Sequence, residues 1–76
     1  SLKGLRTSAG SHFFSDYLAK QNSDLIVHLM RLGFIPFAKT NTPELGLSYV
    51  TEPALFGPCR NPYDTNRSAG GSSGGA

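Results

Sequence analysis

The clearest alternation of apolar and polar positions lies between Asn22 and Gly33. Apolar side chains recur there at helical spacing: Leu25, Ile26, Leu29 and Leu32. Asn22 or Ser23 can cap the start, Asp24 suits the first turn, and Gly33 ends the pattern. The pattern predicts an amphipathic helix that begins near Ser23 and stops at Gly33.

A shorter apolar pattern precedes this helix. Residues 12–18 carry four apolar side chains on one helical face: Phe13, Phe14, Tyr17 and Leu18. We predict a short helix or turn there. Residues 1–11 are small and polar and are predicted to be a loop.

Residues 34–38 form a wholly apolar run between Gly33 and Lys39. Such a run is typical of a strand buried on both faces. Pro36 lacks an amide hydrogen, so the strand should lie at a sheet edge or carry a bulge. A helix that leads directly into a buried strand predicts an α/β arrangement.

The following segment changes to turn chemistry. Thr42 suits an N-cap, Pro43 the first helical position and Glu44 the first turn, while Gly46 limits the helix to a turn or two. Prolines, glycines and Asp64 then make regular structure implausible over residues 51–67. We predict a long, ordered coil there, of the kind that usually lines a site.

Composition and charge exclude several classes of function. The 76 residues carry seven Lys and Arg against five Asp and Glu, a net charge of +2 that is scattered along the chain. This argues against nucleic acid as the direct partner. The longest apolar run is too short for a membrane span, and the first residues show no charged n-region followed by an apolar h-region. We expect a soluble, cytoplasmic protein without a membrane partner.

No metal or cofactor is expected either. The single cysteine, Cys59, together with His12 and His28, has none of the close spacings of a zinc site. The phosphate-loop pattern is Gly, any four residues, and then Gly-Lys-Ser/Thr. Residues 33–40 differ from it at one position, because Ala38 stands where the pattern has its second glycine. The residues between Gly33 and Ala38 are apolar instead of glycine-rich, so we do not expect nucleotide binding there.

The last seven residues, Gly70-Gly71-Ser72-Ser73-Gly74-Gly75-Ala76, have almost no side-chain bulk. Their backbone can approach a ligand or a second loop closely. The same composition is also that of a flexible tail. Composition by itself leaves both interpretations open.

Several motifs in order resemble the amidase signature family, and together they cover essentially the whole chain. They are Gly4-Leu5-Arg6-Thr7-Ser8-Ala9-Gly10-Ser11, the helix closing on Leu32-Gly33, Lys39-Thr40-Asn41-Thr42-Pro43-Glu44, Phe56-Gly57-Pro58, Arg60-Asn61-Pro62-Tyr63-Asp64 and the terminal glycine-serine motif. The family includes bacterial amidases, fatty acid amide hydrolases and the A subunits of glutamyl-tRNA amidotransferases.

This resemblance implies an α/β fold with a mixed central sheet flanked by helices, of which residues 1–76 would be one partial domain. It implies amide hydrolysis by acyl transfer through a serine, cis-serine and lysine triad, without a cofactor. Ser72 matches the cis-serine. The lysine would precede Ser1 and the nucleophilic serine would follow Ala76, so we expect the chain to be an excerpt of a longer enzyme.

The resemblance also assigns supporting roles and partners. Ser73, Gly70 and Gly71 belong to the loop of Ser72, and Gly46, Leu47 and Ser48 match positions near the acyl-binding region. Thr40, Asn41 and Arg60 are expected to brace loops by hydrogen bonding, and Cys59 is assigned no chemistry. The expected partner is a small-molecule amide, and the assembly is left open between a homodimer and an amidotransferase complex.

Two alternatives remain at this point. The first is the A subunit of an amidotransferase, which releases ammonia from glutamine within a complex. The second is a non-enzymatic binding domain, which would hold if the native chain ended at Ala76.

Overall fold

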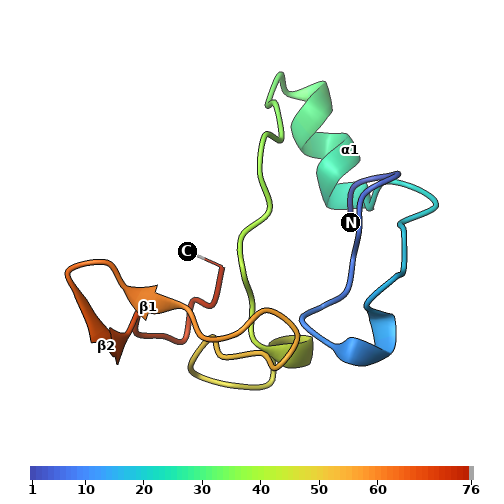
Figure 1. Cartoon of the computed structure of the whole chain (residues 1–76). Helices are drawn as coiled ribbons and strands as arrows, with labels where there is room; N and C mark the ends of the chain where they lie inside the picture. The colour runs from blue at the N-terminus through green and yellow to red at the C-terminus, as the bar shows by residue number, and fades with distance from the viewer. Residues whose placement is uncertain (76) are drawn as a thin grey trace.

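The structure is a computed structural model, and it describes residues 1–75. Short elements are joined by long coils: a 3₁₀ turn η1 (His12–Phe14), helix α1 (Asp24–Arg31), a 3₁₀ turn η2 (Glu44–Gly46) and strands β1 (Arg60–Asn61) and β2 (Asp64–Ser68). Figure 1 shows α1 at one end of the molecule and the hairpin of β1 and β2 far from it. The molecule is elongated, with extents of 40 × 28 × 18 Å.

Helix α1 confirms the predicted amphipathic helix and its start. Ser23 is the N-cap with extended backbone, and Asp24 lies in the first turn, where its charge favours the positive end of the helix. The Ser23 hydroxyl does not cap the helix; it donates to the backbone oxygen of Ser1 at 3.3 Å. The N-cap backbone geometry is therefore formed, while the side chain ties the helix start to the N-terminus.

The end of α1 is a Schellman motif centred on Gly33. The amide of Phe34 donates to the carbonyl of Leu29 at 3.0 Å, and that of Gly33 to Met30 at 3.0 Å. Gly33 has φ +90°, a conformation that L side chains rarely adopt. The predicted stop at Gly33 is confirmed.

The predicted strand over residues 34–38 is wrong for the chain that the structure describes. This segment is irregular, and Phe34, Ile35 and Phe37 are 62%, 83% and 95% exposed. It runs beside α1 and lines an apolar groove of about 200 Å³ with Ile26, Leu29 and Met30. A strand needs a neighbour to pair with its amides and carbonyls, and the sheet of residues 1–75 lies at the other end of the molecule.

The two single-turn elements lie close to their predicted positions. The turn η1 occupies the start of the segment predicted as a short helix or turn. At η2, Pro43 is the N-cap with extended backbone, so the predicted cap at Thr42 is one residue too early. Gly46 ends η2 after one turn, as predicted.

The hairpin contradicts the coil predicted throughout residues 51–67. Strands β1 and β2 pair antiparallel, with Arg60 opposite Ser68 and Asn61 opposite Asp64. Pro62 was one reason for predicting coil, yet it lies in the connecting turn, where no ladder donor is required. Residues 51–59 are irregular, as predicted. A mixed central sheet is not formed within residues 1–75, whose sheet has two antiparallel strands.

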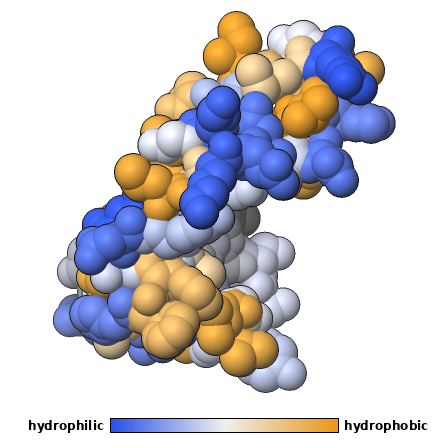
Figure 2. Space-filling model, turned by 90° about the vertical axis from the view of Figure 1, so that its right-hand side faces the viewer, coloured by the Kyte–Doolittle hydropathy of each residue, from blue (hydrophilic) through white to orange (hydrophobic). Residues whose placement is uncertain are grey.

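The buried side chains of residues 1–75 are small. They are Ser8, Ser11, Ala19, Pro43, Thr51 and Pro53. Large apolar side chains are instead exposed along the chain, and Figure 2 shows hydrophobic residues spread over the visible face. The interior of this chain is therefore held by hydroxyl groups and close backbone contacts.

This interior predicts the behaviour of the 76 residues expressed by themselves. Ordering the backbone costs about 1–2 kcal/mol per residue, and small buried side chains offset little of it. We expect no cooperative thermal transition by circular dichroism or calorimetry. A sharp transition in a monomer of this chain would contradict the expectation.

A second prediction concerns Gly33 in the full-length protein that carries this segment. A Cβ added at Gly33 would meet no atom within 4 Å, so a substitution there tests backbone conformation alone. Gly33→Ala should lower the free energy of unfolding by about 1 kcal/mol, and Gly33→Asn by less, because asparagine tolerates positive φ. Denaturant unfolding of both variants checks this. Equal losses would show that the cap does not depend on a left-handed Gly33.

Candidate functional site

The glycine-serine loop, defined here as residues 70–75, packs against the middle of the chain. A Cβ on Gly71 would lie 1.6 Å from the carbonyl oxygen of Tyr49, and one on Gly74 would lie 2.4 Å from Cδ of Pro43. Of the two interpretations left open for this stretch, the described residues adopt the close-contact loop. Ala76 lies outside the described residues.

Two threonine hydroxyls hold the C-terminal end of this loop. Oγ1 of Thr51 donates to the carbonyl of Gly74 at 3.1 Å, and Oγ1 of Thr40 donates to the carbonyl of Gly75 at 2.5 Å. Thr51 is buried, whereas Thr40 is exposed. The expectation that Thr40 braces a loop is confirmed. Thr51 was missed, because an isolated threonine in predicted coil gives no pattern.

Ser72 lies exposed at the turn of the loop. Its backbone carbonyl accepts from the amide of Gly74 at 2.7 Å, and its peptide bond with Gly71 is cis. The Ser72 hydroxyl makes no hydrogen bond to any residue in the range 1–75. The backbone of Ser72 is thus engaged while its side chain stays available.

Ser73 and Cys59 line a common cavity beside the loop. With Thr51 and parts of residues 69–74, they line a cavity of about 240 Å³. The backbone of Cys59 links two segments, because its amide donates to Thr51 at 2.8 Å and its carbonyl accepts from Ala69 at 3.2 Å. Ala69 directly precedes the glycine-serine loop, so this ladder orients the start of the loop.

Three further residues were expected to support the site: Gly46, Leu47 and Ser48. Gly46 ends η2, the side chain of Leu47 is 83% exposed, and Oγ of Ser48 accepts from the amide of Val50 at 3.3 Å. The backbone of Tyr49, the next residue, makes the contact with Gly71. Residues 46–48 therefore directly precede the residue that contacts the loop, Tyr49.

A second set of contacts holds the opposite side of residues 40–51, called here the middle segment. Oγ of the buried Ser11 donates to Oε1 of Glu44 at 2.6 Å, and the amide of Leu45 donates to Ala9 at 2.8 Å. A Cβ on Gly10 would lie 2.9 Å from the carbonyl oxygen of Thr42. The middle segment is thus clamped between residues 9–11 and the glycine-serine loop.

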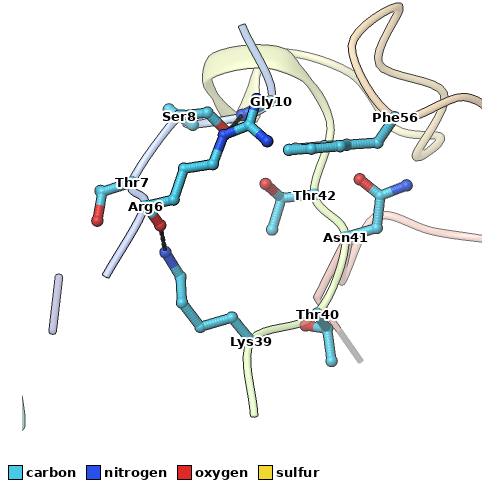
Figure 3. Close-up of a pocket in the computed structure, with 10 residues that line it drawn as sticks. Arg6, Thr7, Ser8, Gly10, Lys39, Thr40, Asn41, Thr42 and Phe56 are labelled. Atoms are coloured by element: carbon cyan, nitrogen blue, oxygen red, sulfur yellow. Dashed lines mark hydrogen bonds between the residues drawn. The ribbon is translucent and has the colours of Figure 1, made fainter. Parts of the chain in front are cut away.

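A cavity of about 610 Å³ opens between residues 6–10, residues 39–42 and Phe56 (Figure 3). Arg6 and Lys39 line it and give it positive charge. The Arg6 guanidinium lies 5.3 Å from the centroid of the Phe56 ring, and Nζ of Lys39 donates to the carbonyl of Arg6. Lys39 therefore ties two segments of the chain together.

Asn41 and Arg60 were also expected to brace loops. Nδ2 of Asn41 donates to the carbonyl of Gly57 at 3.2 Å, while its Oδ1 is buried without a partner among the described residues. Arg60 forms an ion pair with Glu52 at 3.7 Å, and both side chains are nearly half exposed. Water screens such a pair, so it stabilises the fold by at most about 1 kcal/mol.

The described residues offer neither a metal site nor a membrane-spanning helix. No group of three or more His, Cys, Asp or Glu side chains within residues 1–75 is placed to hold a metal ion. None of the helices in that range has the length and apolar character to cross a membrane.

Comparison with known proteins finds one family profile, described as Amidase, that matches residues 1–76. The chain is 41% identical over 76 residues to the A subunit of glutamyl-tRNA(Gln) amidotransferase from Sulfurisphaera tokodaii. It is 40% identical over 76 residues to the protein of that name from Treponema pallidum. It is 43% identical over 74 residues to fatty acid amide hydrolase 1 from Caenorhabditis elegans.

These alignments cover 100%, 100% and 97% of this chain but 16%, 15% and 13% of the three relatives. The chain therefore spans about one sixth of the length of the curated relatives it matches. No solved structure matches the chain.

The contact at Gly71 predicts a strict size limit there. In the full-length protein, Gly71→Ala would force the loop or the Tyr49 backbone to move and should lower stability by about 1–3 kcal/mol. Gly70→Asn is the comparison: at φ +94° it strains the backbone, but open space around its Cβ position leaves no clash, so it should lose less stability. Thermal melts compare them. A Gly71→Ala protein as stable as wild type would contradict the packed loop.

Proposed function

The chain belongs to the amidase family, and on that basis we propose that the protein containing it hydrolyses amide bonds by acyl transfer. The observation that carries the proposal is the family match over residues 1–76. It is supported by the exposed Ser72, which lies in a glycine loop that packs against Tyr49 and Pro43. In this proposal residues 1–76 are one part of a larger α/β domain, and no cofactor takes part.

We assign the proton relay to Ser72. A hydroxyl accepts a proton on a lone pair while it donates its own, so it can connect two groups that exchange protons. The loop supports this assignment in two ways. The Ser72 backbone is fixed by the bond from Gly74, and its hydroxyl is not used by residues 1–75. Gly71 and Gly74 let the loop pack closely while the Ser72 side chain stays exposed.

The proposed reaction needs a nucleophilic serine and a neutral lysine from the parts of the protein outside residues 1–76. When the nucleophile attacks the acyl carbon, its proton passes to Ser72 as Ser72 passes its own proton to the lysine. When the C–N bond breaks, the departing nitrogen keeps the electron pair and takes a proton from Ser72, which the lysinium restores. Water then repeats the sequence on the acyl-enzyme. We infer that residues 1–76 by themselves are inactive.

The remaining expected residues receive supporting roles in the proposal. Ser73 positions the loop, Gly71 allows its close approach to Tyr49, and Gly70 supplies the left-handed backbone (φ +94°) that precedes it. Residues 46–48 are assigned to the acyl-binding side, because they lead directly into the segment that touches Gly71.

A second candidate function is favoured by the names of several relatives. They are called A subunits of glutamyl-tRNA(Gln) amidotransferase, which points to an amidase that works in a complex on glutamine. Ammonia release from glutamine that rises when partner subunits are added would favour this candidate. Hydrolysis of other small amides by the isolated full-length protein would favour the amidase.

The relay predicts how Ser72→Ala behaves in the full-length enzyme. Folding should be nearly unchanged, because the exposed Ser72 hydroxyl packs against little. Amide hydrolysis should slow by about 10²–10⁴-fold, the usual range for a general acid or base. The loss should be smaller on an ester of the same acyl group, since an alkoxide needs less protonation than an amine.

The measurement is the steady-state rate on a matched amide and ester, with thermal melts of each variant. Ser73→Ala is the matched control and should lose less activity than Ser72→Ala. If Ser72→Ala lost equally on both substrates and melted earlier in proportion, Ser72 would be a structural turn residue and the relay would be wrong.

A further inference from the structure

Thr51 is the point to which both ends of the glycine-serine loop are tied. At the far end, its Oγ1 donates to the carbonyl of Gly74 at 3.1 Å. At the start of the loop, its carbonyl accepts from the amide of Cys59 at 2.8 Å, and the carbonyl of Cys59 accepts from Ala69 at 3.2 Å. Thr51 is 6% exposed, so water has little access to compete for these bonds.

The link from Thr51 to Ser72 passes through one residue, Gly74. Gly74 accepts from the Thr51 hydroxyl with its carbonyl and donates to the carbonyl of Ser72 with its amide at 2.7 Å. A Cβ on Gly74 would lie 3.1 Å from Oγ1 of Thr51 and 2.4 Å from Pro43, so the loop also has little space to shift toward this side. The position of the Ser72 backbone therefore depends on the Thr51 hydroxyl.

We propose that Thr51 is a positioning residue for the hydrolytic reaction: its buried hydroxyl holds the loop so that the Ser72 hydroxyl meets its proton partners. This inference rests on the proposed function of Ser72. Thr40 makes the parallel bond to Gly75 at 2.5 Å, but it is exposed and water can replace its hydroxyl. Thr51 is thus the more important of the two anchors.

Thr51→Val in the full-length enzyme removes the hydroxyl but keeps the shape and the backbone ladder to Cys59. The kcat for an amide should fall by about 10- to 100-fold with little change in KM, because small misplacements of a reacting group cost up to about 100-fold. The fall should be smaller for the matched ester. Thr51→Ser keeps the hydroxyl and should retain most of the activity. Thr65→Val, at an exposed position of β2, is the matched control and should change nothing.

A double variant separates positioning from general destabilisation. If Thr51 acts through Ser72, Thr51→Val should cause no further loss of amide hydrolysis in the Ser72→Ala enzyme. The same fold-loss in both backgrounds, or equal losses on amide and ester, would overturn the inference. If Thr51→Val does not fold, Thr51→Cys replaces it, since a thiol is a weaker donor of similar size. An amide-selective loss then supports the inference, and its absence overturns it.

The same measurements distinguish this inference from the proposed function. If Ser72→Ala strongly slows amide hydrolysis while folded Thr51→Val does not, Thr51 is not a positioning residue and the role of Ser72 stands. If Ser72→Ala leaves amide hydrolysis unchanged, both assignments are overturned.

Discussion

Close approach of backbone segments is the constraint on which the described structure depends. The middle segment, residues 40–51, lies between residues 9–11 on one side and the glycine-serine loop on the other. Gly10, Gly71 and Gly74 allow contacts at distances that a Cβ would prevent. Hydroxyls of Ser11, Thr40 and Thr51 then supply the hydrogen bonds that only such short separations permit.

This constraint explains how the loop is positioned although little apolar surface is buried. Buried polar groups are stable only when they are hydrogen-bonded, and Ser11 and Thr51 each donate to an oxygen in the neighbouring segment. Such bonds are directional, so they fix positions more sharply than apolar contacts do. The proposed role of Ser72 requires its hydroxyl at a defined place, and directional bonds suit that requirement.

The two ends of the molecule carry different surfaces. Helix α1 and residues 34–38 present apolar side chains to solvent, including Phe34, Ile35 and Phe37. The contacts around the glycine-serine loop do not involve them (Figure 1). Within residues 1–75, the apolar groove beside α1 and the hydrogen bonds that hold the loop therefore involve different residues.

Local sequence determined the features whose physics is local. The limits of α1 followed from its periodicity and from Gly33, because a helix bonds within itself and its left-handed cap favours glycine. The family motifs identified Ser72 as the residue to assign to the reaction, and that assignment stays a prediction. Tertiary structure alone decided the rest. The strand expected at residues 34–38 has no neighbour within residues 1–75, and Pro62 permits a hairpin because it falls in its turn. The role of Thr51 depends on Gly74, 23 residues away, and sequence spacing does not encode such a contact.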